Sequence, residues 1–223
     1  LCRFLTAMGA RIAGMGTNNL IVEGVEAMHG AEYTPIPDRI EAGTLACAAA
    51  MTDGSVLLQN ARSDHMRALM FKLSESGVIF QEDQKGLRLR GKAKRPMEVR
   101  TLSYPGFPTD MQPQFAALLA VANGTSVVTE SVWESRFQYV DELRKMGADV
   151  TVDGNRATIN GVARLKAADV SATDLRAGAA LIIAGLNAEG ETKVAGVEKI
   201  ERGYDDIVGK LKSIGAEVEL IEE

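Results

Sequence analysis

The stretch Leu143-Arg-Lys-Met-Gly-Ala-Asp-Val150 carries the pattern that decides the fold, because similar phrases recur at intervals of about 70 residues. The other copies begin at Leu5, Leu73 and Leu211. In each copy a glycine stands where a helix end needs a left-handed residue, and an alternating apolar segment follows. The phrase therefore predicts a helix, a glycine cap and a strand. After Val150 an Asp-Gly pair predicts the turn of a strand hairpin.

A second phrase alternates with the first and predicts buried helices. Asp38, Asp110 and Asp174 each precede a segment that is apolar on nearly all sides, which is typical of a helix inside a domain and not on its surface. Strands should then wrap around these helices. Aspartate is also a strong helix N-cap, so simple capping is an alternative explanation for each of the three.

Together the phrases predict an α/β (α+β) fold made of three tandem repeats. Each repeat would contain a strand, a buried helix, a strand, a surface helix and a strand hairpin. Pro35 and Pro37 punctuate the best candidate for a domain crossing. Residues 1–34 are therefore expected to be the tail of a preceding repeat domain, and residues 35–223 to form a second one. The opening residues resemble the end of an amphipathic helix, so we expect further sequence upstream in the parent protein.

Composition excludes several classes of function. With 25 basic and 30 acidic residues the net charge is −5, which argues against a nucleic-acid surface. No apolar run approaches the ~20 residues of a membrane helix. Two cysteines, Cys2 and Cys47, offer neither a disulfide framework nor a zinc quartet, and no signal peptide is visible. We expect a cytoplasmic protein that binds no membrane, no nucleic acid and no metal.

Several charged residues are candidates for chemistry. Two prolines and a glycine stiffen the loop that delivers Asp110 to a helix start. Arg136 and Arg202 occupy corresponding positions, each shortly after the strand that follows a buried helix. Arg176 lies in the first turn of an apolar helix, where a guanidinium is costly to bury unless it meets an anion. An internal ion pair with Asp174 or another acid is the alternative for Arg176.

Four motifs in order carry a resemblance to a known family. Phe107-Pro-Thr-Asp-Met-Gln112, Glu134-Ser-Arg-Phe137, Ala172-Thr-Asp-Leu-Arg176 and Glu201-Arg-Gly-Tyr204 are similar to the C-terminal half of the UDP-N-acetylglucosamine enolpyruvyl transferases. The resemblance spans essentially the whole chain. It implies a domain of three inside-out α/β repeats, one of two that flank a cleft. It also implies transfer of the enolpyruvyl group of phosphoenolpyruvate to the sugar 3-hydroxyl, the first committed step of peptidoglycan synthesis, and hence a role in cell wall biogenesis, cell shape and cell division.

The resemblance implies a role for each matched residue. Asp110 corresponds to the aspartate that contacts the sugar hydroxyl and is the proposed general base. Asp174 corresponds to an aspartate beside the reacting centre. Val132 and Trp133 fall where the family contacts uracil. The phosphoenolpyruvate side of the cleft would be lined by Arg136, Arg176 and Arg202, the last being the match to a phosphate ligand and counted with the catalytic residues.

Some positions depart from the family pattern. Trp133 replaces the usual phenylalanine, Ser135 replaces asparagine, and Gln138 and Tyr139 replace a methionine-histidine pair. The charged groups are intact, so these departures concern the nucleotide pocket more than the reaction class.

The largest departure is an absence. In the family the N-terminal half supplies a lysine-asparagine pair, further arginines and a mobile loop whose cysteine acts as the acid. Cys47 lies on a buried apolar segment and Cys2 on the opening helix, and neither follows a glycine-rich loop, so we expect neither to be catalytic. The expected partners are the two substrates and the missing N-terminal domain, with no cofactor. Alone, this chain is expected to be inactive.

Two other functions stay open at this point. The shikimate-pathway enolpyruvyl transferase shares the fold and chemistry, but it needs extra groups for the second phosphate of shikimate 3-phosphate. A non-catalytic module that only binds ligand is the other alternative.

Overall fold

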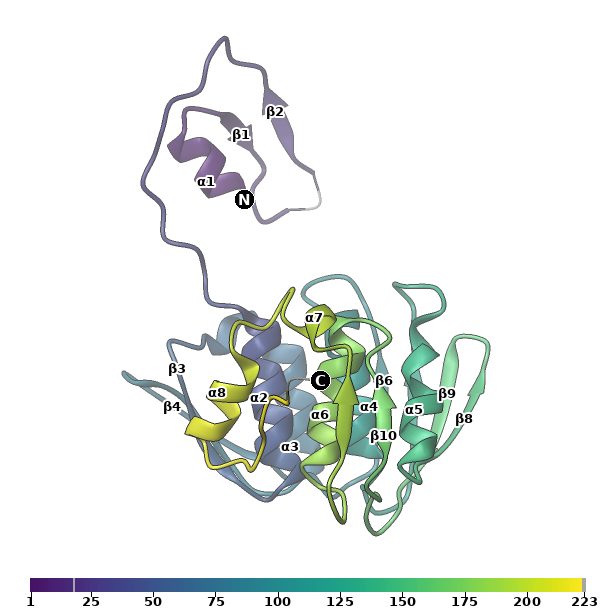
Figure 1. Cartoon of the computed structure of the whole chain (residues 1–223). Coiled ribbons are helices and arrows are strands. Elements are labelled where there is room, and N and C mark those ends of the chain that lie inside the picture. The colour runs from purple at the N-terminus through teal and green to yellow at the C-terminus, as the bar shows by residue number, and fades with distance from the viewer. Residues whose placement is uncertain (18, 222–223) are drawn as a thin grey trace. The chain divides into compact units, whose positions relative to one another are not determined.

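The computed structural model describes residues 1–17 and 19–221 and divides into two units, Leu1–Pro37 and Asp38–Glu223 (Figure 1). The first unit contains helix α1 (Cys2–Ala7) and the antiparallel strands β1 (Arg11–Ala13) and β2 (Ile21–Glu23). None of its described residues is buried. The division lies close to the predicted crossing at the two prolines.

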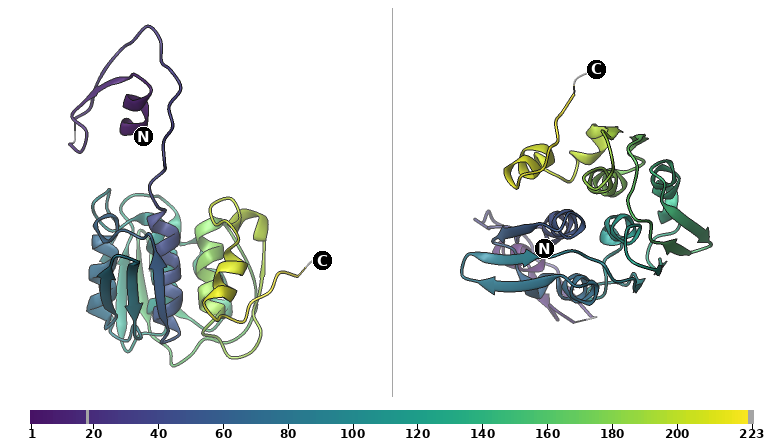
Figure 2. Two further views of the ribbon diagram at one scale, coloured as in Figure 1. Left: turned by 90° about the vertical axis from the view of Figure 1, so that its left-hand side faces the viewer. Right: turned by 90° about the horizontal axis from the view of Figure 1, so that it is seen from below.

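Three helices form the interior of the second unit, as the apolar segments predict. They are α2 (Arg39–Met51), α4 (Gln112–Leu119) and α6 (Leu175–Gly185), seen end-on in the right-hand view of Figure 2. All residues of α4 are buried, and the small side chains of α2 and α6 allow the three helices to pack closely. The predicted inside-out architecture is confirmed.

Three sheets surround these helices (Figure 1). The first repeat forms an antiparallel sheet of order β3-β5-β4, the second a mixed sheet of order β6-β7-β9-β8, and the third the parallel pair β10-β11. Gly154, at a positive φ of 56°, makes the predicted hairpin turn between β8 and β9. The strands are β3 (Ser55–Gln59), β4 (Ile79–Asp83), β5 (Gly86–Arg90), β6 (Glu98–Arg100), β7 (Thr125–Thr129), β8 (Asp149–Asp153), β9 (Arg156–Asn160), β10 (Asp169–Ser171) and β11 (Lys193–Ala195).

The outer helices end at the glycines of the recurring phrase. These helices are α3 (Arg67–Ser76), α5 (Val140–Lys145) and α8 (Ile207–Ser213), with the short α7 (Val197–Ile200) before α8. Gly77, Gly147 and Gly215 follow them with φ angles of 114°, 83° and 93°. A side chain at such angles would be strained, which explains why glycine recurs there.

Two parts of the expected repeat are wrong in the described residues. No strand lies between β2 and α2, where Pro35 and Pro37 lack the amide hydrogen that a strand ladder needs. No strand or hairpin follows α8, so residues 216–221 differ from their counterpart β8. In the second repeat β8 pairs only with β9, and the described part of the third repeat supplies no equivalent of β9.

Within the described residues, every helix is too short or too polar to cross a lipid bilayer.

Candidate active site

Three aspartates precede the inner helices, and the structure uses them in two ways. Asp38 and Asp174 cap α2 and α6, each accepting bonds from two first-turn amides, the shorter of which is 2.7 Å in both helices. Asp110 lies in a 3-10 turn, η2 (Thr109–Met111), which separates it from the start of α4. The capping explanation is therefore right for Asp38 and Asp174 and wrong for Asp110.

Asp110 instead meets two arginines from different repeats. Nη2 of Arg136 donates to Oδ1 and Nη2 of Arg176 donates to Oδ2, both at 3.2 Å. The Arg136 and Arg176 side chains are 5% and 13% exposed, whereas that of Asp110 is 38% exposed. The structure thus brings together one accessible carboxylate, the buried guanidinium of Arg136 and the mostly buried guanidinium of Arg176. Arg176 pairs with Asp110, while its only bond to Asp174 is through its own backbone amide.

Arg136 is held at the base of the loop that follows β7. It begins the 3-10 turn η3 (Arg136–Tyr139), and its guanidinium lies 4.9 Å from the centre of the Trp133 ring. Its Nε is buried and meets no hydrogen-bond acceptor among the described residues. Nε and Nη1 of Arg176 are likewise buried and meet no acceptor among the described residues. Buried donors left without acceptors favour the arrival of an anion, because a guanidinium binds carboxylate or phosphate through several N–H groups at once.

The side chain of Tyr204 contacts Arg176 of α6 through its ring and residues of α2 and α4 through its hydroxyl. The guanidinium of Arg176 lies 5.2 Å from the centre of the Tyr204 ring. The Tyr204 hydroxyl shares a 2.9 Å hydrogen bond with Thr44 of α2 and accepts a 3.1 Å bond from Gln114 of α4. Burial raises the pKa of Tyr204, so its hydroxyl stays protonated. Burial lowers the pKa of Arg176, but the Tyr204 oxygen and the Asp110 carboxylate outweigh it and raise the pKa overall.

Arg202 lies two residues before Tyr204, but its side chain makes no hydrogen bond or ion pair with Asp110, Arg136 or Arg176. Its side chain is exposed and makes no ion pair or hydrogen bond with any other described residue. The next residue, Gly203, packs against the start of α6, where an added Cβ would lie 2.4 Å from Leu175 and 3.6 Å from Nη1 of Arg176. The backbone therefore passes beside Arg176 while the Arg202 side chain reaches solvent.

The predicted uracil contacts lie on the surface of the same loop as Arg136. Val132 is 48% exposed and Trp133 is 59% exposed. Large apolar side chains are usually covered, so an exposed pair beside a buried guanidinium is a candidate contact for a flat apolar ligand group.

The family relationship rests on nearly the whole chain. The profile of the EPSP synthase family, 3-phosphoshikimate 1-carboxyvinyltransferase, matches residues 1–211. The chain belongs to this family.

Curated relatives narrow the relationship within the EPSP synthase family. A UDP-N-acetylglucosamine 1-carboxyvinyltransferase 1 from Caldanaerobacter subterraneus is 51% identical over 98% of this chain and 53% of its own length. A protein of the same name from Staphylococcus aureus is 48% identical over 100% of this chain and 53% of its own length. The chain thus spans about half the length of the curated relatives it matches. The resemblance seen in the four motifs is confirmed.

Solved structures of an enolpyruvyl transferase and of an EPSP synthase share the fold. The enolpyruvyl transferase NikO from Streptomyces tendae superposes with a TM-score of 0.82 at 30% identity, over 95% of this chain and 51% of its own. An EPSP synthase from Acinetobacter baumannii superposes with a TM-score of 0.74 at 20% identity, over 99% of this chain and 55% of its own. The second likeness shows the fold alone.

Neither cysteine belongs to the cluster of Asp110, Arg136 and Arg176. Cys47 is fully buried on α2, and burial raises the pKa of its thiol, so the nucleophilic thiolate is suppressed. Cys2 belongs to the first unit. The described residues contain no group of three or more histidine, cysteine, aspartate or glutamate side chains that could hold a metal ion.

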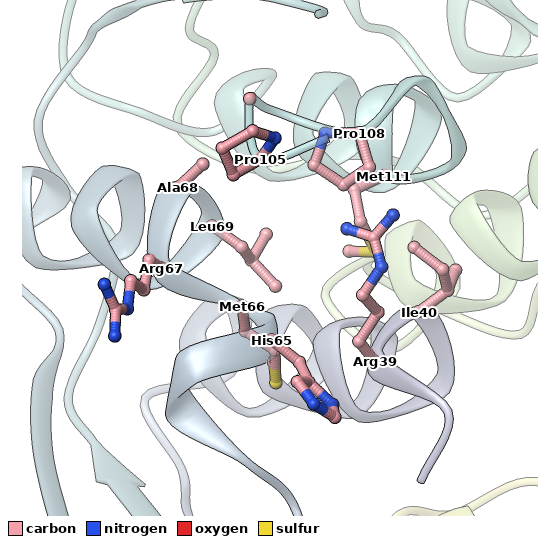
Figure 3. Close-up of a pocket in the computed structure, with 11 residues that line it drawn as sticks. Arg39, Ile40, His65, Met66, Arg67, Ala68, Leu69, Pro105, Pro108 and Met111 are labelled. Atoms are coloured by element: carbon pink, nitrogen blue, oxygen red, sulfur yellow. The ribbon is translucent and has the colours of Figure 1, made fainter. Parts of the chain in front are cut away.

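A pocket lies beside the Asp110 loop and contains none of the predicted site residues (Figure 3). Arg39, the first residue of α2, and Met111, which directly precedes α4, line one part of it. Leu69 of α3 and His65, just before α3, line another part. Pro105 and Pro108, which belong to the loop that carries Asp110, line a further side of it. The pocket is therefore adjacent to the cluster but separate from it.

Sequence reasoning missed the residues that hold the cluster in place. Tyr204 lies in one of the four motifs without a predicted role, and neither Gln114 nor Thr44 is among the predicted site residues. Their signal was weak, because single polar residues within apolar segments reveal a partner only when the fold is known. The one available signal is Gly203 next to Tyr204, because a glycine before an aromatic residue is compatible with a backbone that packs closely against its neighbours.

Proposed function

We propose that this chain is the C-terminal half of a UDP-N-acetylglucosamine 1-carboxyvinyltransferase, which transfers the enolpyruvyl group of phosphoenolpyruvate to the sugar 3-hydroxyl. The observation that carries this proposal is the Asp110 carboxylate, accessible and bound by Arg136 and Arg176 from two different repeats. The names of the relatives that are 48–51% identical over the chain support this sugar nucleotide as the acceptor. Such an enzyme acts in peptidoglycan synthesis, and through it in cell shape and division.

The proposed reaction is an addition followed by an elimination. Asp110 accepts the proton of the sugar 3-hydroxyl, and the resulting oxygen attacks C2 of phosphoenolpyruvate. A proton reaches C3 from the half of the enzyme that this chain does not contain. The tetrahedral adduct then loses a C3 proton and expels phosphate, which leaves the enolpyruvyl ether.

The arginines supply charge stabilisation in this mechanism. Their unused N–H groups would bind the carboxylate and phosphate of phosphoenolpyruvate, whose charge grows as the adduct forms. When those anions arrive, Arg136 and Arg176 can exchange Asp110 for the ligand, which would release the carboxylate to face the sugar hydroxyl. Arg202 would extend toward the phosphate from its exposed position. Asp174 would act beside the reacting centre with the carboxylate oxygen that does not cap α6.

Residues 1–34 fit the tail of a preceding domain in this proposal. Ile21 and Val22 of β2 are 69% and 67% exposed, and apolar strand residues of this kind need a covering partner. The two cysteines form no disulfide with each other, which is compatible with the proposed cytoplasmic location.

Two experiments test the proposal. Calorimetric titration of the chain with UDP-N-acetylglucosamine, phosphoenolpyruvate and shikimate 3-phosphate should show a preference for the sugar nucleotide over the shikimate. A stronger response to shikimate 3-phosphate would contradict the substrate assignment.

The second experiment measures phosphate release. The chain alone should release none above background, because half a cleft cannot position both substrates. Joining it to the part of the Caldanaerobacter relative that lies outside the matched region should produce release that requires both substrates. Release by the isolated chain would refute the half-site proposal.

A further inference from the structure

Glu130 is a buried carboxylate at the end of β7 that none of the roles above uses. It is 3% exposed and pairs with no arginine, lysine or histidine among the described residues. Its Oε1 accepts hydrogen bonds from the Thr101 hydroxyl at 2.6 Å, the Val132 amide at 2.8 Å and the Trp133 amide at 3.1 Å. Its Oε2 accepts a 2.9 Å bond from the Thr109 hydroxyl. Four donors therefore satisfy a group that, as a carboxylate, can only accept.

The backbone of Glu130 is fixed by the neighbouring hairpin. Its amide donates to the carbonyl oxygen of Asn155 at 2.8 Å, and its own carbonyl accepts a 2.9 Å bond from Nδ2 of Asn155. Asn155 lies in the turn between β8 and β9, which belongs to the four-stranded sheet. Glu130 is thus anchored to a rigid part of the domain while its side chain reaches two loops.

Those two loops carry the proposed site. Thr109 immediately precedes Asp110, and Val132 and Trp133 precede Arg136 on the other loop. The Thr101 hydroxyl also accepts a 2.7 Å bond from the amide of Ser131, so the second loop is held at consecutive positions.

We propose that Glu130 is a positioning residue that sets the distance between the Asp110 loop and the Trp133 loop, so that ligand contact on one loop is transmitted to the other. Its action on Asp110 passes through the hydroxyl of Thr109. The meaning of this coupling for catalysis rests on the proposed function, whereas the positioning itself does not.

The first test reads the Trp133 loop without any substrate. In Glu130→Ala the amides of Val132 and Trp133 lose a buried acceptor, and hydrogen exchange there should accelerate by about tenfold or more. Glu130→Gln retains an acceptor oxygen and should restore most of the protection, while Glu130→Leu retains volume without an acceptor and should not. Glu134→Ala, a nearby exposed acid, is the matched control and should leave exchange unchanged.

The pattern of rescue decides this test. If Leu and Gln protect the two amides equally, Glu130 only fills space and the proposal is overturned. The same holds if Glu130→Ala leaves exchange unchanged. Trp133 is the sole tryptophan, so its emission spectrum provides a second readout that should shift in the Ala and Leu variants and stay unshifted in the Gln variant.

The second test isolates the connection to Asp110. Thr109→Val removes one hydroxyl and leaves Glu130 with its other three donors. In the joined enzyme described above, we expect kcat for phosphate release to fall about tenfold, with KM for the sugar nucleotide changed less than about twofold. An unchanged kcat would overturn the coupling. If the joined enzyme releases no phosphate at all, the proposed function fails, and the exchange test still decides the role of Glu130.

Discussion

The loops that carry Arg136 and Arg202 occupy equivalent positions in the second and third repeats, yet their arginines are in opposite states. Arg136 is buried, lies over an aromatic ring and pairs with Asp110. Arg202 is exposed and makes no polar contact with the other described residues. Glu130 also holds the Arg136 loop by two backbone amides, whereas beyond Arg202 the chain is held by the close packing of Gly203 and by the buried Tyr204.

This difference shows that the side chain of Arg136 is fixed by packing and an ion pair without ligand, whereas the side chain of Arg202 is not. A buried paired guanidinium contributes to folding as well as to binding, because removing it strands a partner. An exposed guanidinium contributes little to folding, so its presence is explained by what it binds. Substitutions at the two positions should therefore separate stability from activity.

The largest expected effect is on the activity of Arg202→Met. Phosphate release by the joined enzyme should fall by about 100-fold or more, because one charged contact to the developing phosphate is lost. The free energy of unfolding, measured by urea titration, should change by less than about 0.5 kcal/mol. Retained activity would show that Arg202 is merely a surface residue.

Arg136→Met should lower stability much more than Arg202→Met does. Loss of the buried guanidinium removes its contacts with Trp133 and Asp110 and should lower the free energy of unfolding by about 2 kcal/mol. The accessible Asp110 carboxylate can be hydrated, which keeps the cost below that of a fully buried pair. Equal stability changes for Arg136→Met and Arg202→Met in urea titrations would contradict the comparison.

Gly203→Ala tests how the Arg202 loop is held. The added methyl group would lie 2.4 Å from a terminal carbon of Leu175, so the loop or the leucine must shift. We expect a destabilisation of about 1 kcal/mol in thermal or urea unfolding. Gly54→Ala, at a glycine without a positive φ where the added group would lie no closer than 3.4 Å to another atom, is the matched control without crowding. An equal cost for Gly203→Ala and Gly54→Ala would leave no role for the Leu175 contact.

The smallest expected effect comes from Ser135, which precedes Arg136. Its φ of 58° lies in the left-handed region, which asparagine adopts more readily than serine. Ser135→Asn should therefore stabilise the chain by about 0.5 kcal/mol, seen as a small rise in Tm. A fall in Tm would show that the serine side chain makes a contribution that outweighs the strain.

The sequence predicted most of the architecture from two recurring phrases. Glycines at helix ends and apolar helices opened by aspartate are local signals, and they identified the inner helices and the hairpin turn at Gly154. The incomplete parts lie at the first and third repeats, where residues 33–37 and 216–221 form no strand. A strand depends on a neighbour with which to pair, so its local pattern is not sufficient.

The site was predictable only in part for a similar reason. The surroundings of Asp110, Arg136 and Arg176 identify them as candidates, the resemblance adds their roles, and the structure brings them together. The alternative of an internal ion pair for Arg176 is what the structure shows, but with Asp110 and not with Asp174. The contacts of Glu130 and Tyr204 join segments that are far apart in the chain. Nothing in the residues around them indicates those partners, because each is set by the packing of the repeats.

The most direct measurement of the central claim compares phosphate release by the joined enzyme with Asp110 and with Asp110→Asn. If the carboxylate between Arg136 and Arg176 is the general base, the substitution should lower kcat by about 100-fold or more while the folded chain keeps its circular dichroism spectrum. Release at the original rate by the asparagine variant would contradict the assignment of Asp110, and with it the proposed active site.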